Sequence, residues 1–245
     1  MQIIQKLTEA GYAFLSAAEM SAALHVDLAR LNALEEWWSS LPRDQYLRDG
    51  GRYRARRHAS FIQEGAKLAL APHRAHWQPT SYNALHGGME RWFEPIASEV
   101  VNDPAWIQLV TSIGSLITQI RPVNRWFIEA HQFRIDTTGG IGRPTPEGAH
   151  RDGVDFVALL LVRRQDVRGG ETRVFDANGP SGVRFTMQEP WSLLLMDDER
   201  VIHETTPIQP EGGSGVRDTL VLTYRARGFQ APVDAPSIQV SNTRS

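Results

Sequence analysis

Two short motifs combine a histidine with an aspartate two residues later. His150 and Asp152 lie in PEGAHRDGVDF, and His25 and Asp27 lie in LHVDL. Imidazole and carboxylate groups are common ligands of iron and other transition metals, provided that both side chains can reach the same ion. The local structure around each motif therefore decides which pair could bind a metal.

Side-chain direction distinguishes the two pairs. His25 and Asp27 fall within an apolar pattern with helical spacing, where residues two apart point to different sides, so we interpret them as flanks of a helix. His150 and Asp152 precede FVALLLV, a run typical of a strand, and in a strand residues i and i+2 project to the same side. Only this second pair is predicted to bind one ion together.

A third ligand is expected in the strand-like segment VIHETT, where His203 follows the turn DDER. Two histidines and one carboxylate on one face of an octahedron leave three positions open, as in non-haem Fe(II) oxygenases. A structural zinc site is more often closed by four protein ligands. The spacing favours a catalytic metal site made by His150, Asp152 and His203. A polar barrel rim without a metal is the alternative.

Arg217 and Thr219 follow in VRDTLVLTY and share one face of the predicted strand. A guanidinium offers a forked set of donors to a carboxylate, and a neighbouring hydroxyl can complete the contact. After a metal triad, such a pair is predicted to bind the distal carboxylate of 2-oxoglutarate. The alternative is a surface ion pair between Arg217 and Asp218 or Glu211.

The second half of the chain is predicted to supply the strands that position these side chains. Short segments rich in β-branched or aromatic residues are separated by Gly, Pro, Asp and Asn turns. They cover 126–136, 156–162, 171–176, 183–187, 191–198, 201–206 and 218–226. Strands without intervening helices indicate an antiparallel barrel or sandwich, with a jelly roll preferred. The consecutive apolar residues of FVALLLV indicate that both faces of its strand are buried.

The first half is predicted to be mainly helical. Ser16 and Glu19 fit a capping box, and apolar residues at helical spacing continue to Trp38. A second helix begins after Asp103 and ends before Pro122. The stretch 52–93 mixes strand-like and loop-like signals.

These patterns together predict a mainly β fold with some α structure. We expect a single domain over residues 1–245, in which helices from the first half cover one face of the jelly roll. Residues 1–122 would form the mainly helical support, residues 123–230 the catalytic core, and residues 231–245 a C-terminal tail.

Composition limits the expected partners and location. The 245 residues carry a formal net charge of −2 without a long run of one sign, which argues against nucleic acid or an anionic membrane as a partner. There is no cysteine, so disulfides and thiolate metal sites are excluded. No signal-peptide pattern opens the chain, and no apolar run approaches the roughly 20 residues that span a bilayer. A cytoplasmic protein is expected. The oligomeric state is open, with a homodimer as one expectation.

Several motifs together resemble one protein family. They are PTPEGAHRDGVDFV, RGGET, DDERVIHETTPI and RDTLVLTYR, with the earlier RYRARRHASF, SYNALHGGMERWF and EAHQFRI. Over most of its length, from Gly11 to Arg227, the chain resembles the bacterial 2-oxoglutarate/Fe(II)-dependent dioxygenases. That family includes L-isoleucine 4-hydroxylase and the related biofilm stress and motility protein A.

The resemblance implies a double-stranded β-helix, or cupin-like jelly roll, with Fe(II), 2-oxoglutarate as cosubstrate and O2. The implied reaction is hydroxylation of an aliphatic C–H of a free, isoleucine-like amino acid, with release of succinate and CO2. By position, His150, Asp152 and His203 are the implied iron ligands and Arg217 the 2-oxoglutarate anchor. Thr219 is added from the strand geometry.

An amino-acid substrate needs a partner for its carboxylate, and arginines near the barrel mouth are the natural candidates. Arg52, Arg54, Arg57 and Arg134 qualify, and Arg54 and Arg134 are the expected substrate contacts. Tyr82 is a third expected contact, because it lies in a loop-like segment within the family resemblance.

Histidines outside the triad are treated separately. His131 shares a strand face with Phe127 and Phe133, and is expected either to contact the cosubstrate or to lie satisfied in the core. His73 and His76 in PHRAH are close in sequence, but a second metal site made by them is not expected.

Two other functions fit the same residues. A cupin-type metal enzyme that does not use 2-oxoglutarate would keep the metal triad but would not need Arg217 or Thr219. A non-catalytic ligand-binding barrel, such as a sensor in stress or biofilm physiology, could bind both metal and 2-oxoglutarate without oxidising a substrate.

Overall fold

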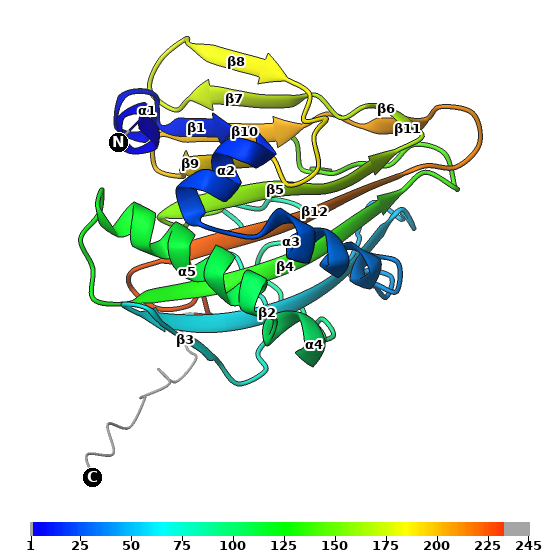
Figure 1. Cartoon of the computed structure of the whole chain (residues 1–245). Coiled ribbons are helices and arrows are strands. Elements are labelled where there is room, and N and C mark those ends of the chain that lie inside the picture. Colours follow the sequence, from blue (N-terminus) through cyan, green and yellow to red (C-terminus); the bar gives the residue numbers. More distant parts are fainter. Residues whose placement is uncertain (1, 233–245) are drawn as a thin grey trace.

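The computed structural model describes residues 2–232, and its largest element is a seven-stranded antiparallel sheet (Figure 1). The strand order is β1-β9-β5-β12-β4-β2-β3. In this order the strands are β1 (Tyr12–Leu15), β9 (Leu193–Asp197), β5 (Phe156–Gln165), β12 (Val216–Arg225), β4 (Trp126–Asp136), β2 (Arg54–Glu64) and β3 (Lys67–Leu70).

Two smaller sheets complete the β structure. One has the order β10-β7-β8, with β10 (Val201–Thr205), β7 (Thr172–Asp176) and β8 (Gly182–Phe185), and the other pairs β11 (Ile208–Pro210) with β6 (Val167–Gly169). An apolar cluster joins Leu159 and Leu194 of the large sheet to Val174 and Val201 of the three-stranded sheet. The arrangement is the predicted jelly roll, or double-stranded β-helix.

Helices cover the other face of the large sheet (Figure 1). The helical elements are α1 (Gln2–Ala10), α2 (Ala17–Leu24), α3 (Leu28–Ala33), the 3-10 helix η1 (Leu34–Trp38), α4 (Ser98–Val101) and α5 (Pro104–Thr118). The main apolar core lies between these helices and the sheet. Along β5, Ala158 and Leu160 belong to this core, whereas Leu159 faces the second cluster. The prediction that both faces of this strand are buried is therefore confirmed.

The helical pattern that ends at Trp38 is divided into three pieces. His25 ends α2 in the left-handed conformation, with φ 54°, and Asp27 caps α3 by accepting hydrogen bonds from the N–H groups of Ala29 and Arg30. Asp27 thus has a structural role in starting a helix. Among residues 2–232, none of the helices combines the length and the apolar character needed to cross a bilayer.

The first half of the chain is less helical than predicted, because it contributes β1, β2 and β3 to the large sheet. β2 pairs with β4 from Arg54, opposite Ile135, to Gln63, opposite Trp126. β2 lies within the stretch 52–93, whose mixed sequence signals did not predict a buried strand. The expected C-terminal tail falls outside the described residues from position 233 onward.

Candidate metal centre and pocket

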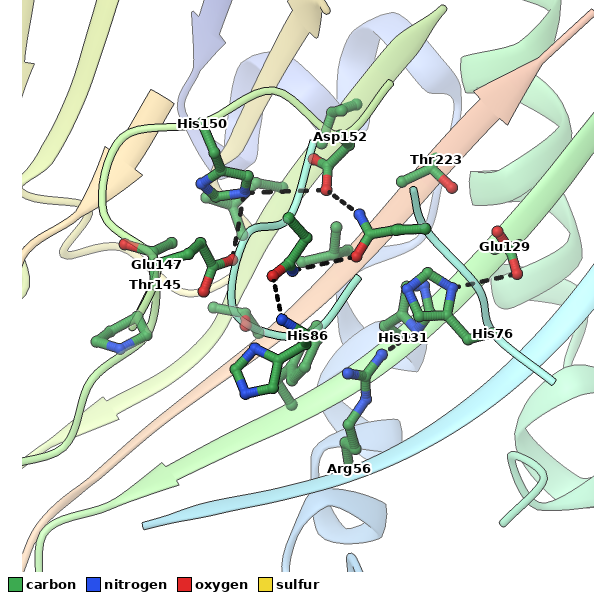
Figure 2. Close-up of a pocket in the computed structure, with 18 of the residues that line it drawn as sticks. Arg56, His76, His86, Glu129, His131, Thr145, Glu147, His150, Asp152 and Thr223 are labelled. Carbon is green, nitrogen blue, oxygen red and sulfur yellow. Dashed lines mark hydrogen bonds and ion pairs between the residues drawn. The ribbon is translucent and has the colours of Figure 1, made fainter. Parts of the chain in front are cut away.

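His150, Asp152 and His203 line one pocket between the sheets. Figure 2 shows His150 beside Asp152 in this pocket. Their potential ligand atoms all lie within 4.8 Å of one another. Two backbone hydrogen bonds of 3.0 Å, one in each direction between His150 and His203, align the segment before β5 with β10. Residues paired in this way have neighbouring side chains, which explains how ligands more than fifty positions apart meet.

Both histidines direct Nε2 toward Asp152. His150 Nδ1 donates to the carbonyl of Gly148 at 2.9 Å, so Nε2, which lies 3.9 Å from Asp152 Oδ1, is the nitrogen that remains for a metal. His203 Nε2 lies 3.7 Å from Asp152 Oδ2, and burial lowers the pKa of His203 to about 3. Burial disfavours the charged form of His150 as well, but the negative charges of Asp152 and Glu147 raise its pKa above the ordinary value.

The turn that carries Asp152 is fixed by a buried carboxylate. Asp198 accepts hydrogen bonds from the N–H groups of Asp152, Gly153 and Val154 at 3.0, 2.8 and 3.1 Å. Burial and the nearby charge of Asp152 raise the pKa of Asp198 to about 7. On the other side of the turn, Gln230 Nε2 donates to the carbonyls of Asp152 and Gly153. Both contacts orient the backbone of the metal-binding turn.

Gly153 is required by its conformation and by Tyr82. Its φ is +74°, which favours glycine, and a Cβ placed there would lie 2.5 Å from the ring of Tyr82. Tyr82 therefore packs against the metal-binding turn, and it is not one of the residues that line the pocket. Its contact with substrate stays a prediction.

Arg217 and Thr219 line the same pocket, and both are buried. Within residues 2–232, Arg217 Nε and Nη2 have no hydrogen-bond partner, and no carboxylate pairs with the guanidinium. The adjacent Asp218 is instead held by Arg134 through two hydrogen bonds of 2.8 and 2.7 Å. Burial lowers the pKa of Arg217 to about 10, so it remains charged at neutral pH. A buried, unpaired guanidinium fits a carboxylate ligand.

Only some of the arginines that were predicted to contact substrate lie in the pocket. Arg54 lines the pocket, but Arg134 does not, because its guanidinium is paired with Asp218 away from the pocket. Arg57 forms an ion pair of 3.0 Å with Glu94, and Arg52 is exposed outside the pocket.

Two arginines of the pocket wall were missed by the sequence analysis. Arg56 follows Arg54 by two residues, so the period-two rule of strands could have found it once β2 was recognised. Arg91 lies in an irregular segment, where no strand or helix period indicates its direction, although it falls within the motif SYNALHGGMERWF.

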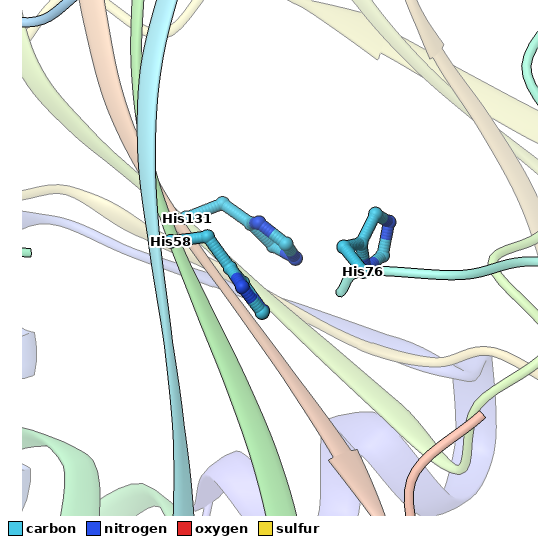
Figure 3. A group of neighbouring side chains, drawn as sticks. All are labelled: His58, His76 and His131. Atoms are coloured by element: carbon cyan, nitrogen blue, oxygen red, sulfur yellow. The ribbon is translucent and has the colours of Figure 1, made fainter. Parts of the chain in front are cut away.

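His131 lines the pocket as well, as part of a second cluster of histidines (Figure 3). Potential ligand atoms of His58, His76 and His131 lie within 4.8 Å of one another. His58 and His131 are cross-strand partners on β2 and β4 with stacked rings. His73 does not join them, because it hydrogen-bonds to the carbonyl of Phe93.

A jelly roll that presents two imidazoles and one carboxylate in an interior pocket defines the class of non-haem iron oxygenases. The model of the 2OG-Fe dioxygenase family matches residues 35–223. The chain therefore belongs to the 2OG-Fe dioxygenase family, which uses Fe(II), 2-oxoglutarate and O2. His150, Asp152 and His203 are suited in type to hold Fe(II), and Arg217 is suited to hold the cosubstrate.

Solved structures resemble most of the chain. A bsmA homologue from Methylobium petroleophilum PM1 is 53% identical, with 94% of each chain covered and a TM-score of 0.90. IDO from Bacillus thuringiensis is 18% identical over 93% of this chain and 95% of its own, with a TM-score of 0.75. The Fe(II)/α-ketoglutarate-dependent dioxygenase TqaL is 19% identical over 92% and 86%, with a TM-score of 0.70. No curated protein matches the chain.

Proposed function

We propose that this protein hydroxylates an aliphatic C–H of a free, isoleucine-like amino acid, with 2-oxoglutarate converted to succinate and CO2. The observation that carries the proposal is one pocket that contains both the His150, Asp152 and His203 cluster and the unpaired guanidinium of Arg217. The choice of an amino acid rests on the sequence resemblance and on the charged groups that line the pocket.

Each group of the pocket has a distinct task in this proposal. His150, Asp152 and His203 would hold Fe(II), which together with 2-oxoglutarate and O2 supplies the oxidising chemistry. Arg217 would bind the distal carboxylate of 2-oxoglutarate, with Thr219 beside it on the same strand face. The apolar side chains of Val157, Leu159 and Val221, together with the burial of the pocket, would exclude water.

A turnover assay tests the activity. The purified protein is supplied with Fe(II), 2-oxoglutarate, O2 and a panel of amino acids that includes L-isoleucine, and both succinate and the hydroxylated product are measured. We expect succinate and product in equal amounts for at least one aliphatic amino acid. Binding of metal and 2-oxoglutarate without any product over the whole panel would favour the ligand-binding barrel instead.

Replacement of Arg217 tests the cosubstrate assignment. Arg217→Ala removes a buried charge-assisted contact worth about 1.5–3 kcal/mol, so we expect the KM for 2-oxoglutarate to rise by about 10-fold or more. The KM for the amino acid should change little. Arg168→Ala is a matched control, because Arg168 is exposed on β6 and contacts Gln209. An unchanged KM for 2-oxoglutarate in Arg217→Ala would contradict the assignment.

A further inference from the structure

One wall of the pocket carries more positive than negative charge. Asp44 pairs with Arg54 at 2.8 Å and lies 3.9 Å from Arg56, so one carboxylate serves two guanidinium groups. Arg91, also on this wall, is 2% exposed and donates to the neutral amide of Gln78 at 2.9 Å. No carboxylate pairs with Arg91 in the described part of the chain. Since burial of an unpaired charge is costly, an anionic ligand would stabilise this wall.

His131 offers the same wall a hydrogen-bond donor. Arg56 Nη2 lies 2.7 Å from His131 Nδ1, and a guanidinium can only donate, so Nδ1 accepts. In a neutral imidazole the proton then resides on Nε2. Burial and the neighbouring positive charges hold the pKa of His131 well below its usual range, which keeps the ring neutral. Within residues 2–232, the Nε2–H of His131 has no acceptor.

These hydrogen bonds disfavour a second metal ion between His58, His76 and His131 (Figure 3). Glu129 Oε1 accepts from His58 Nε2 at 3.2 Å and from His76 Nδ1 at 3.3 Å. His131 Nε2 is protonated for the reason above. An ion would have to displace these protons in a region where Arg56 already places positive charge. The cluster is better suited to support His131 than to bind a cation.

We propose that Arg56, Arg91 and His131 bind the carboxylate of the amino-acid substrate, an inference that rests on the proposed function. Arg56 is held in place by the rings of Phe93 and Phe133, whose centroids lie 3.8 and 4.4 Å from its guanidinium carbon. The three side chains supply two cations and one neutral donor, a combination that suits a carboxylate. Figure 2 shows Arg56 beside His131 on this wall.

This subsite is distinct from the one assigned to 2-oxoglutarate. Across the β12 and β4 pair, Arg217 lies opposite Ile135 and His131 lies opposite Val221, and four residues along a strand correspond to about 13 Å. Arg56 on β2 lies opposite Phe133, halfway between these two levels. Two anion subsites at different levels of the barrel match two reactants that each carry a carboxylate. 2-Oxoglutarate would occupy the subsite at Arg217, and the amino acid would occupy the other.

Equilibrium binding tests the assignment without turnover. Protein loaded with Fe(II) and 2-oxoglutarate without O2 is titrated with L-isoleucine, or with the panel amino acid that is turned over fastest, in a calorimeter. Arg91→Met and His131→Leu should each weaken amino-acid binding by about 10-fold or more, because each removes a buried contact to the carboxylate. The Kd for 2-oxoglutarate, measured separately, should stay unchanged. Arg57→Met is the matched control, because Arg57 points away from the pocket to Glu94.

A second experiment changes the ligand instead of the protein, so its result for the parent protein does not depend on the stability of a variant. The corresponding amino alcohol lacks the carboxylate, so the parent protein should bind it more weakly than the acid, by well over about 10-fold. In Arg91→Met this preference for the acid should shrink by about 10-fold, because the contacts to Arg56 and His131 remain.

Each remaining outcome has a defined meaning. A preference that persists undiminished in both variants would overturn the subsite assignment while leaving the proposed function intact. A raised Kd for 2-oxoglutarate would assign the subsite to the cosubstrate and also overturn the inference. Absence of both binding and turnover across the panel would overturn the proposed function itself.

Discussion

The amide of Gln78 joins the metal centre to the cationic wall of the pocket. Its Nε2 donates to Asp152 Oδ1 at 3.1 Å, and its Oε1 accepts from Arg91 at 2.9 Å and from Asn83 at 3.3 Å. These partners fix the orientation of the amide, because a carboxylate can only accept and a guanidinium can only donate. One side chain thus orients a proposed metal ligand and a proposed substrate contact together.

Replacement of Gln78 should weaken metal binding. Gln78→Leu removes the donor that orients Asp152, and loss of such an outer contact typically costs about 10–100-fold in metal affinity. The affinity for Fe(II) can be measured by anaerobic calorimetry, with Asp152→Ala as the variant expected to lose binding more completely. Gln209→Leu is the control, since Gln209 is exposed and contacts Arg168. An affinity for Gln78→Leu equal to that of the control would contradict the role of Gln78.

At the scale of elements, β2 is connected to the preceding loop through Asp44. The carboxylate accepts from Arg54 Nε at 2.8 Å and from the N–H of Tyr46 at 2.9 Å. Burial alone would raise the pKa of Asp44, but the charges of Arg54 and Arg56 hold it below its ordinary value of 3.8. The ionised form therefore stabilises the folded state.

Asp44→Asn should lower the free energy of unfolding by about 3–5 kcal/mol at neutral pH, because it leaves buried arginines without their carboxylate. A group whose pKa is lowered by folding stabilises the protein above its unfolded pKa, and this contribution is lost as the pH falls through the folded pKa. The difference between parent and variant should stay constant down to about pH 4 and shrink below it.

Urea unfolding at a series of pH values measures this difference. Glu36→Gln, on an exposed carboxylate of η1, serves as the control and should change the stability little. A difference for Asp44→Asn that is small at neutral pH, or that grows on acidification, would be inconsistent with the ion pair.

Local pattern predicted some elements well and others poorly. The expected strand 126–136 matches β4. His150 and Asp152 come together as predicted, although they lie in a turn before β5 and not on the strand that the period-two rule assumed. The clustering of His58 with His131 could not be recognised from local pattern. It depends on the register between β2 and β4, which joins residues far apart in sequence. Tertiary pairing, rather than propensity, determines these positions.

In the molecule as a whole, the residues that stabilise the fold and those that line the pocket lie on opposite faces of the large sheet. One face packs against α2, α3 and α5 and forms the main apolar core, while the other face lines the pocket. Trp38 of η1 links the two layers, because its indole N–H donates to the carbonyl of Thr219 at 3.0 Å. Changes within the helical layer should therefore affect stability more than ligand binding.

Leu109→Ala tests this separation. Leu109 is fully buried in α5, so the cavity left by the substitution should cost about 2–5 kcal/mol of unfolding free energy. The KM for 2-oxoglutarate should remain that of the parent at temperatures where the variant is folded. Urea unfolding and steady-state assays measure the two quantities. Ile107→Ala, at a more exposed position of the same helix, is the matched control. A large change in KM without loss of stability would contradict the separation.

The contact of Gln230 with the carbonyls of Asp152 and Gly153 also bears on the order of biosynthetic events. A nascent chain that has emerged from the ribosome only as far as β12 already contains all three proposed iron ligands, but it lacks the amide that braces their turn. Productive iron loading would then follow translation of residue 230, and a ribosome-stalled fragment ending before that position should capture the ion less tightly than the released protein.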